Sequence, residues 1–165
     1  MTEDERLPVS EDEARKTSGS EVTVEEVASV TPEVARALAL LVPQLSSSAP
    51  PPSDVDIADI ARSAGTVLLV ARDSSGEIVG SLTLVVFRAP TGPRAWIEDV
   101  VVDEAQRGSG VGSALVNEAL TRAEAVGART VDLTSRPSRE AANRMYLRLG
   151  FTRRETYVYR HDLGP

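Results

Sequence analysis

Three glycines set two residues apart, with an arginine just before them, form the stretch of this sequence best suited to chemistry. They are Gly108, Gly110 and Gly112 in the segment QRGSGVG, which follows the run DVVVD and leads into a helix-like stretch. Glycine has no side chain to keep an anion away from the backbone, and the first N–H groups of a helix have no partner within that helix. Arg107 adds a full positive charge beside them. The pattern therefore favours a cradle for a diphosphate group.

Two other interpretations of these glycines are open. A tight turn from a strand into a helix also uses small residues, although one or two glycines would be enough for it. A nucleotide-binding loop needs a Gly-Lys-Ser/Thr ending or the spacing G-x-G-x-x-G, and the segment has neither.

Composition excludes several other kinds of site. The 165-residue chain has no cysteine, so disulfides, thiolate metal sites and a cysteine nucleophile are excluded. Its one histidine, His161, argues against a histidine metal site or a serine–histidine–acid triad. The net charge of −7 argues against nucleic-acid binding. No apolar stretch resembles a membrane span or a secretory signal, so we expect a cytoplasmic protein with no membrane partner.

The chain divides into a tail and one domain. Residues 1–20 contain six acidic and three basic residues without apolar periodicity, and we predict a disordered acidic tail there. A partner-binding segment is the alternative. Residues 21–165 are predicted to form a single α/β domain.

The elements that would position the glycines follow from the apolar periodicity. The predicted order is strand, two helices, three strands, helix, strand, helix and strand, over residues 21–29, 32–45, 54–62, 66–73, 78–88, 94–103, 110–126, 128–135, 138–150 and 151–163. Thr31, then Ser53 or Asp54, and finally Ser138 are the predicted helix caps, and Gly150 ends the last helix. The strand–helix–strand unit at 94–134 favours a parallel pair, and the hairpins before it favour antiparallel pairing. A mixed sheet with helices on its faces follows.

Two segments resemble the signatures of the GNAT family of N-acetyltransferases. Arg107-x-x-Gly110-x-Gly112 matches the family motif (Gln/Arg)-x-x-Gly-x-(Gly/Ala), and NRMYLRLGF at 143–151 is similar to its second signature. The resemblance extends over residues 22–162 and implies the GNAT-like acyl-CoA N-acyltransferase fold, a mixed, mostly antiparallel sheet with a splayed parallel pair. Glu104 stands where family members often have proline, and residues 30–65, the usual substrate-selecting region, match nothing recognisable.

The resemblance implies an N-acetyltransferase that moves an acetyl group from acetyl-CoA to a primary amine of a small molecule, by direct attack in a ternary complex and without a metal. Backbone groups of Val100, Val101 and Val102 would contact the pantetheine arm, and Asn143 would contact the coenzyme. The residues that would wrap the diphosphate are Arg107, Gly108, Ser109, Gly110, Val111, Gly112 and Ser113. The alternatives are a protein lysine or N-terminal acetyltransferase and a non-catalytic acyl-CoA-binding module.

Glu98 and Tyr146 are the candidate catalytic residues. An amine with a pKa of about 10.4 binds mostly as ammonium, so a base must accept a proton. By strand alternation Glu98 shares a face with Val100 and Val102, although it is equally a surface acid or an arginine partner. Asp99 is the second choice. By resemblance Tyr146 would protonate the departing thiolate, with a core tyrosine as the alternative. A backbone N–H near Val100 is the predicted oxyanion donor.

Other side chains have less specific predictions. Trp96, Tyr157 and Tyr159 could line an acceptor pocket or a homodimer face, with core packing as the favoured alternative. Arg136 and Arg139 could dock an anionic acceptor group or lie in a solvated loop. The segment IEDVVV is also similar to a strand of glucosamine-6-phosphate acetyltransferases, but it is too short to assign a sugar substrate.

Overall fold

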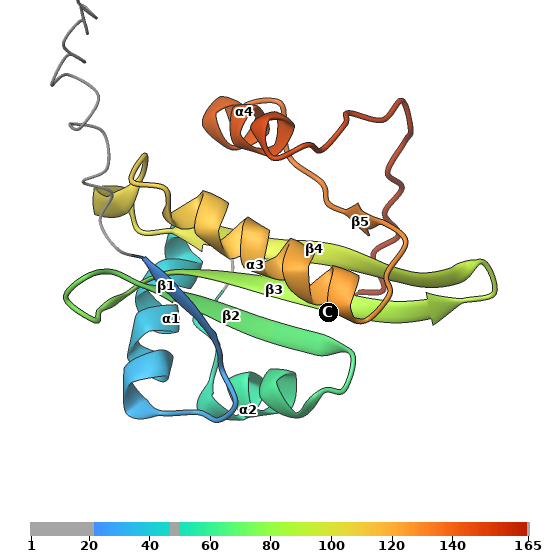
Figure 1. Ribbon diagram of the computed structural model, residues 1–165. Helices are drawn as coiled ribbons and strands as arrows, with labels where there is room; N and C mark the ends of the chain where they lie inside the picture. The colour runs from blue at the N-terminus through green and yellow to red at the C-terminus, as the bar shows by residue number, and fades with distance from the viewer. Residues whose placement is uncertain (1–21, 47–49, 165) are drawn as a thin grey trace, which may run out of the picture.

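The computed structural model describes residues 22–46 and 50–164, so the tail predicted for residues 1–20 lies outside the described residues. The described chain forms one sheet with helices on both of its faces (Figure 1). The elements are β1 (Thr23–Glu26), α1 (Pro32–Leu45), α2 (Asp54–Arg62), β2 (Thr66–Arg72), β3 (Ile78–Ala89), β4 (Gly92–Val102), the short 3₁₀ helix η1 (Glu104–Gln106), α3 (Val111–Ala125), β5 (Val131–Asp132) and α4 (Glu140–Arg148).

The strands of the described sheet lie in chain order, from β1 at one edge to β5 at the other. The first three neighbouring pairs are antiparallel, and β4 pairs with β5 in parallel, with α3 as the crossover between them. The predicted mixed, mostly antiparallel sheet is therefore confirmed. The parallel pair is short, because only Ala95 and Trp96 of β4 pair with Val131 and Asp132 of β5 within the described residues.

Each face of the sheet has its own apolar core. Helix α3 covers one face, where Leu115 and Val116 pack against Leu82 and Leu84 of β3. Helices α1 and α2 cover the opposite face, where the buried side chains are Val27, Val34, Leu38, Ile57, Leu68 and Val70. Helix α4 lies on the α3 side (Figure 1), and its apolar residues pack against the α3 core. The two faces thus carry different helices. A side chain of β4 points either toward α3 and α4 or toward α1 and α2.

Local capping signals explain where α1 and α2 begin. Thr31 accepts a hydrogen bond from the Val34 N–H at 3.2 Å, and Pro32 occupies the first helical position. Ser53 Oγ accepts the Asp56 N–H at 3.2 Å while the Asp56 carboxylate accepts the Ser53 N–H at 2.8 Å. This reciprocal pair satisfies two N–H groups that the helix itself leaves free. The predicted caps at Thr31 and Ser53 are confirmed.

Predictions near the C-terminus are partly wrong. Helix α4 starts at Glu140 with Arg139 at its cap position and no side-chain cap, because Ser138 lies in a turn. The strand predicted at 128–135 shortens to β5, and residues 151–163 form no strand at all. An alternating pattern yields a strand only where it finds a hydrogen-bonding partner and a face to bury. Neither is provided for the predicted last strand, in which Tyr157 and Tyr159 are 84% and 88% exposed.

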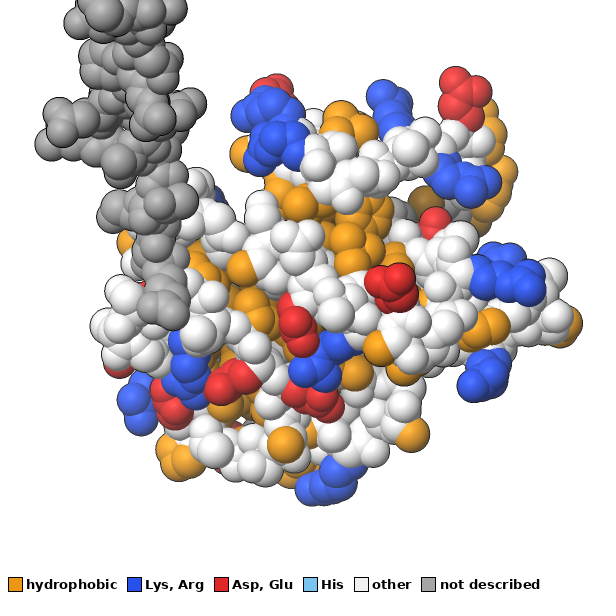
Figure 2. All heavy atoms as spheres, in the orientation of Figure 1, with side chains coloured by type: hydrophobic (Ala, Val, Ile, Leu, Met, Phe, Trp, Pro, Cys, Tyr) orange, Lys and Arg blue, Asp and Glu red, His pale blue; other side chains and the backbone are white. Residues whose placement is uncertain are grey.

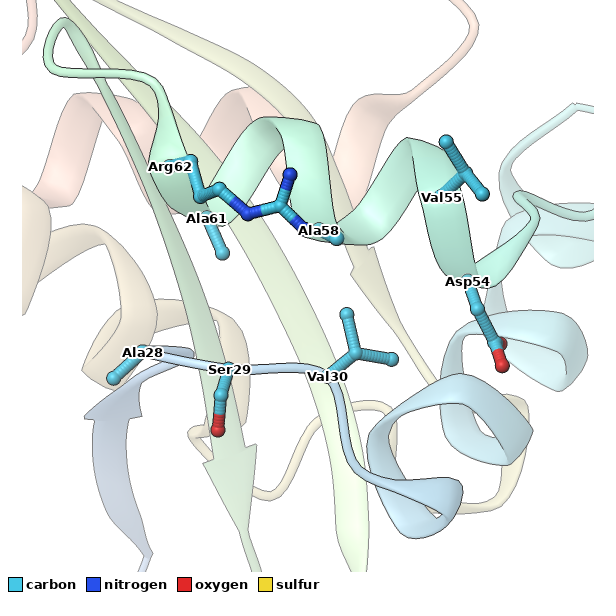
Figure 3. A pocket seen from close by; sticks show the side chains of 8 residues that line it. All are labelled: Ala28, Ser29, Val30, Asp54, Val55, Ala58, Ala61 and Arg62. Carbon is cyan, nitrogen blue, oxygen red and sulfur yellow. The ribbon is translucent and has the colours of Figure 1, made fainter.

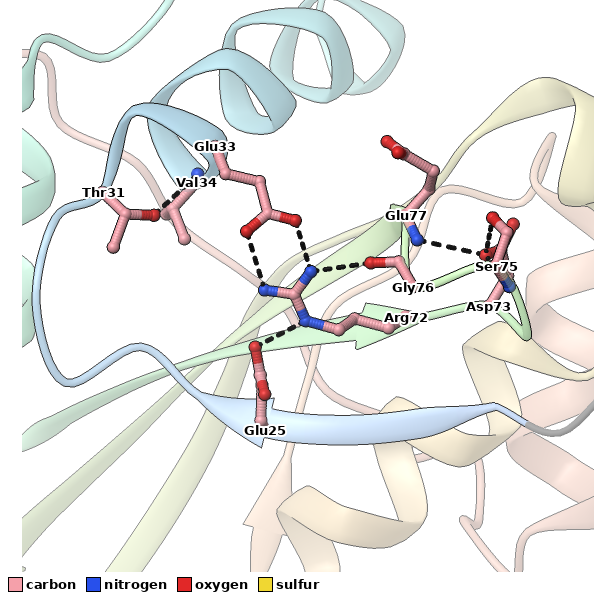
Figure 4. Close-up of polar contacts among 9 residues, drawn as sticks. All are labelled: Glu25, Thr31, Glu33, Val34, Arg72, Asp73, Ser75, Gly76 and Glu77. Carbon is pink, nitrogen blue, oxygen red and sulfur yellow. Dashed lines mark hydrogen bonds and ion pairs between the residues drawn. The ribbon is translucent and has the colours of Figure 1, made fainter.

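Arg72 joins three elements on the β1 side of the molecule (Figure 4). Its guanidinium donates to Glu25 of β1 at 2.7 Å, to both carboxylate oxygens of Glu33 in α1 at 2.5 and 3.2 Å, and to the Gly76 carbonyl at 2.7 Å. The Arg72 side chain is only 21% exposed. A two-pronged, charge-assisted contact of this kind is stronger than an exposed ion pair. We infer that Arg72 holds α1 and β1 together at this end of the sheet.

Replacing Arg72 by Met is expected to lower Tm by about 5 °C, because three charge-assisted contacts are lost at a partly buried site. Arg62→Met is the matched control, since the Arg62–Asp59 ion pair is 75% and 69% exposed and its loss should leave Tm nearly unchanged. Differential scanning calorimetry measures both. Equal effects of the two substitutions would contradict the role given to Arg72.

The same contact predicts a pH dependence. The Arg72 hydrogen bond holds the pKa of the Glu33 carboxyl below its ordinary value of 4.5. A lowered carboxyl pKa stabilises the fold fully above the ordinary value, and that stabilisation disappears as the pH falls through the folded-state pKa. The Tm difference between wild type and Arg72→Met should therefore be constant at neutral pH and shrink below about pH 4.5. A difference that persists at the acid end would show that Glu33 is not involved.

Candidate functional site

The two parallel strands separate immediately after their short contact. Strand β4 continues from Ile97 to Val102, whereas β5 ends at Asp132. On the other side β4 stays paired, with Val101 opposite Ser81. The main-chain groups of the end of β4 that face β5 therefore have no strand partner in the described residues. They include groups of Val100–Val102, the residues predicted to contact the pantetheine arm.

A β-bulge interrupts β4 just before this opening. Val101 lies opposite Ser81 and Glu98 lies opposite Thr83, so β4 has one residue more than β3 between these two pairs. Asp99 takes up the extra length with a φ of 51°, in the left-handed region. Aspartate is among the few residues other than glycine that adopt this conformation readily. An inserted residue of this kind reverses the alternation of side chains along a strand.

The bulge corrects the prediction that Glu98 shares a face with Val100 and Val102. Before the bulge, Ile97 belongs to the core under α3, and after it Val100 and Val102 pack against that same core. Glu98 and its neighbour Trp96 therefore lie on the opposite face, the one covered by α1 and α2. The strand alternation behind the prediction holds only where no residue is inserted.

Trp96 and Glu98 contact each other on that face. The Trp96 indole N–H donates to a Glu98 carboxylate oxygen at 2.8 Å, which fixes one oxygen and leaves the exposed carboxylate able to accept further hydrogen bonds. Glu98 forms no ion pair with an arginine in the described residues, so the predicted alternative of an arginine partner is not found. Trp96 is partly buried beside it.

The glycine segment turns the chain from η1 into α3. Gly108 and Gly110 have φ values of 84° and 93°, and Gly110 occupies the cap position of α3 without any side-chain cap. A Cβ atom at either glycine would meet nothing within 4 Å, so backbone conformation alone requires glycine there. The segment therefore does form a tight turn from a strand into a helix, and the space next to Gly108 and Gly110 is open.

Most main-chain amides of this loop have no acceptor among residues 22–46 and 50–164. The Ser109 N–H donates to the Gln106 carbonyl at 3.3 Å, and the Ser109 hydroxyl donates to the same oxygen at 2.6 Å. In the described part of the chain, no such partner exists for the N–H groups of Gly108, Gly110, Val111, Gly112 and Ser113. Five unpaired donors at a helix N-terminus favour an anion, whereas Ser109 is tied back into the loop.

Gly112 has a second role that the motif did not indicate. A Cβ atom there would lie 3.1 Å from the Met145 sulfur and 3.6 Å from a Val102 methyl group. The absent side chain therefore lets α4 pack closely against the start of α3 and the end of β4. Figure 2 shows hydrophobic side chains gathered between α4 and α3 in this region.

Two residues that sequence reasoning missed hold the base of the loop. The Asp103 carboxylate accepts the Ala105 N–H at 2.9 Å and the Gln44 side-chain N–H at 3.0 Å, and the Gln44 carbonyl oxygen accepts the Glu104 N–H at 2.9 Å. These hydrogen bonds hold the pKa of the Asp103 carboxyl below its ordinary value. The Asp103 cap is a recognisable local signal, but Gln44 lies 59 residues away and no pattern links the two.

The arginines and Asn143 make specific contacts of their own. Arg107 forms an ion pair with Glu104 at 3.4 Å, with both side chains exposed. Arg139 donates to the Leu45 carbonyl at the end of α1 at 3.0 Å. Asn143 donates to the Arg136 carbonyl at 3.0 Å, so it braces the segment between β5 and α4 and is not simply solvent-facing.

Tyr146 packs as a core residue, which is one of the two roles predicted for it. Its ring packs against the core under α3, together with Met145 and Leu149. Burial raises the pKa of the Tyr146 phenol above its ordinary value, against the opposing charge of Arg139. The hydroxyl therefore keeps its proton at neutral pH. The exposed Tyr157 and Tyr159, by contrast, are not core residues, so the favoured alternative for them is wrong.

A surface pocket of about 500 Å³ lies elsewhere, between α2 and the segment that leads into α1 (Figure 3). Its lining is mostly apolar, with Asp54 and Arg62 as the charged residues. Neither Glu98 nor any residue of the glycine segment contributes to it. Within residues 22–46 and 50–164 there is no cluster of metal-binding side chains, and no helix long and apolar enough to cross a bilayer.

Comparison with known proteins gives a consistent result. The model of the Acetyltransferase (GNAT) family matches residues 34–151. A glucosamine 6-phosphate N-acetyltransferase of Trypanosoma brucei brucei is 40% identical over 116 residues, which cover 66% of this chain and 77% of the relative. A crystal structure of a Trypanosoma brucei acetyltransferase is 31% identical with a TM-score of 0.70, over 87% of this chain and 100% of the other.

A further structure shares the fold alone. An aminoglycoside N-acetyltransferase in complex with CoA superimposes with a TM-score of 0.73 at 16% identity, over 90% of this chain and 99% of the other. The fold with its open parallel pair, the glycine turn and these relatives agree with one another. The chain belongs to the GNAT family of acetyltransferases, and it is an acetyltransferase enzyme.

Proposed function

We propose that this enzyme transfers the acetyl group of acetyl-CoA to a primary amine of a small molecule, by direct attack within a ternary complex. The observation that carries the proposal is the row of unpaired amides at the start of α3, beside the opening between β4 and β5. Anions bind such helix starts because the amides and the helix dipole act together. Members of the GNAT family use acetyl-CoA as the acetyl donor, and one solved structure with this fold contains CoA.

Acetyl-CoA would be held by the groups around this opening. The amides of Gly108, Gly110, Val111, Gly112 and Ser113 would receive the diphosphate, with Arg107 at the rim. The main-chain groups of Val100–Val102 that face away from β3 would pair with the amide groups of the pantetheine arm, as a strand would. Asn143, whose side-chain oxygen accepts no hydrogen bond from the described residues, would contact the coenzyme from α4. No metal is needed for this chemistry.

The two catalytic candidates would act from opposite faces of the sheet. The bulge places Glu98 on the α1 side, where an amine would approach, and Tyr146 lies on the α3 side, where the thioester sulfur would lie. Glu98 would accept the proton of the ammonium directly or through water. The lone pair of the amine would then attack the carbonyl carbon, with the Val100 N–H donating to the oxyanion. Tyr146 would donate its proton to the thiolate as the carbon–sulfur bond breaks. The nitrogen, which carries one extra proton after the attack, would release it to water, and Tyr146 would recover a proton from solvent.

An amino sugar is the acceptor that the comparisons favour. The relative that is 40% identical is a glucosamine 6-phosphate N-acetyltransferase, and the match covers 77% of that protein. Glucosamine 6-phosphate should therefore head the panel of amines, followed by aminoglycosides, amino acids and lysine-containing peptides. A peptide that reacts faster than every small amine would replace the small-molecule assignment by the protein acetyltransferase alternative.

We also propose a homodimer. Four apolar side chains of the C-terminal segment, Tyr157, Val158, Tyr159 and Leu163, are 73% to 93% exposed. Clustered exposed apolar residues are typical of interaction surfaces. The cytoplasmic location predicted from composition stays a prediction.

Gly110→Ala is expected to weaken acetyl-CoA binding at least about tenfold, because a side chain at positive φ strains the loop and turns its amides away from the diphosphate. Isothermal titration calorimetry measures the Kd. Gly76→Ala is the matched control: it also has a positive φ of 90° and open space around it, but lies in the turn between β2 and β3. If CoA neither binds nor raises Tm, the proposed site is wrong.

Glu98→Gln and Tyr146→Phe should each lower kcat by about 10²-fold, with little change in KM for acetyl-CoA, because each removes a proton-transfer group. Thiol release measured across the amine panel provides both constants. Asp99→Asn and Tyr159→Phe are the controls, since Asn tolerates the positive φ and Tyr159 is 88% exposed. Loss of activity in Asp99→Asn but not in Glu98→Gln would transfer the role of base to Asp99.

Substituting Ser for both Tyr157 and Tyr159 should convert the proposed dimer to monomer, because it removes the two largest exposed apolar side chains of the segment. Size-exclusion chromatography with light scattering measures the mass. A wild-type mass of one chain at micromolar concentration would rule the homodimer out.

A further inference from the structure

Helix α4 ends in a cap that involves the candidate acid directly. The Gly150 N–H donates to the Leu147 carbonyl at 3.1 Å, and the Phe151 N–H donates to the Tyr146 carbonyl at 3.0 Å. Gly150 has a φ of 90°, which permits this reversal of the chain. The two hydrogen bonds and the left-handed glycine define a Schellman motif. The motif brings Phe151 back over the last turn of the helix.

Phe151 then packs on the ring of Tyr146. The ring centroids lie 5.8 Å apart with an interplanar angle of 66°, an edge-to-face arrangement. Such pairs contribute a directional attraction beyond the area that they bury. Both residues also pack against the core under α3. The Tyr146 ring therefore contacts both the core under α3 and the Phe151 ring.

Phe151 is also the last partly buried residue of the described chain. Every residue from Thr152 to Gly164 is exposed, so the segment beyond Phe151 adds no further restraint to α4. The position of a tyrosine hydroxyl depends on two side-chain torsions, and both are set by what the ring touches. Phe151 in this cap is thus the last residue of the described chain that packs against the core, and it contacts the candidate acid directly.

We propose that the Gly150–Phe151 cap sets the position of the Tyr146 hydroxyl during acetyl transfer, which makes Gly150 and Phe151 positioning residues. This inference rests on the proposed function, in which Tyr146 protonates the departing thiolate. A displacement of an acid by a fraction of an ångström is enough to slow proton transfer. Binding of acetyl-CoA, which depends on the α3 amides, should not change.

The chain contains a matched control for the cap. Helix α3 ends in the same motif, with the Gly127 N–H donating to the Glu124 carbonyl and the Ala128 N–H donating to the Ala123 carbonyl, both at 2.9 Å. Gly127 has a φ of 74°, and a Cβ atom at Gly127 or Gly150 would meet nothing within 4 Å. Alanine at either glycine therefore carries a similar backbone strain, but only the α4 cap involves a tyrosine.

Gly150→Ala and Phe151→Leu are expected to lower kcat about tenfold while KM for acetyl-CoA changes by less than about twofold. Gly127→Ala should lose a similar amount of stability and keep its kcat. Phe151→Tyr should retain activity, because it keeps the aromatic edge. In a Tyr146→Phe background, Phe151→Leu should lower kcat no further, since a positioning residue has nothing left to position. Additive losses in that background would overturn the proposal.

A second readout does not depend on turnover. In NMR spectra of the full chain with labelled tyrosine rings, the Tyr146 signal is identified by its loss in Tyr146→Phe. The ring current of Phe151 should shift this signal, and the shift should be lost in Phe151→Leu and Gly150→Ala but kept in Gly127→Ala. If the Tyr146 signal changes as described but no amine is acetylated, the cap positions the Tyr146 ring and the proposed function is wrong. If amines are acetylated and Gly150→Ala is as active as Gly127→Ala, the positioning fails alone.

Discussion

The single inserted residue at Asp99 is the constraint on which the candidate site depends. Without it, the alternation along β4 would continue, and Glu98 would lie on the same face as Val100 and Val102. With it, the carboxylate lies toward α1 while the two valines stay on the core under α3. Where β5 no longer pairs with β4, the sheet therefore carries a carboxylate on its α1 face and apolar valines on its α3 face. In the proposed ternary complex, the two substrates would approach this point from opposite faces of the sheet.

The surrounding helices hold this opening in shape from three directions. Gln44, at the end of α1, hydrogen-bonds to the base of the glycine loop. Arg139, at the start of α4, reaches the last carbonyl of the same helix. Gly112 allows α4 to contact α3 through Met145. The loop, the helix that carries the candidate acid and the end of α1 are therefore linked by direct contacts. Most of α1 also lies within residues 34–151, which the GNAT family model matches, so the expectation that residues 30–65 match nothing recognisable is wrong.

Most of the fold could be predicted from the sequence, because its signals are local. Thr31 and Ser53 cap their helices through neighbours three residues away, and the alternation of β2 and β3 has a core on each face. The site was less predictable. Alternation cannot reveal an inserted residue, so the prediction of the sheet face on which Glu98 lies is wrong. The contact between Gln44 and Asp103 joins residues 59 positions apart, and no local pattern predicts it. The predicted last strand failed because composition specifies the tendency of a segment to pair, not the presence of a partner.

The carboxamide of Gln44 cannot be replaced by a carboxylate without a penalty at the glycine loop. Its amide donates through nitrogen to the Asp103 carboxylate and accepts through oxygen from a backbone N–H, so the two ends of one carboxamide face groups of opposite polarity. Deamidation would turn this residue into a glutamate and set a second carboxylate against Asp103. Two like charges at hydrogen-bond distance repel, and one of them must take up a proton or move away. A change of this single side chain at the end of α1 would thus loosen the loop that we propose binds acetyl-CoA.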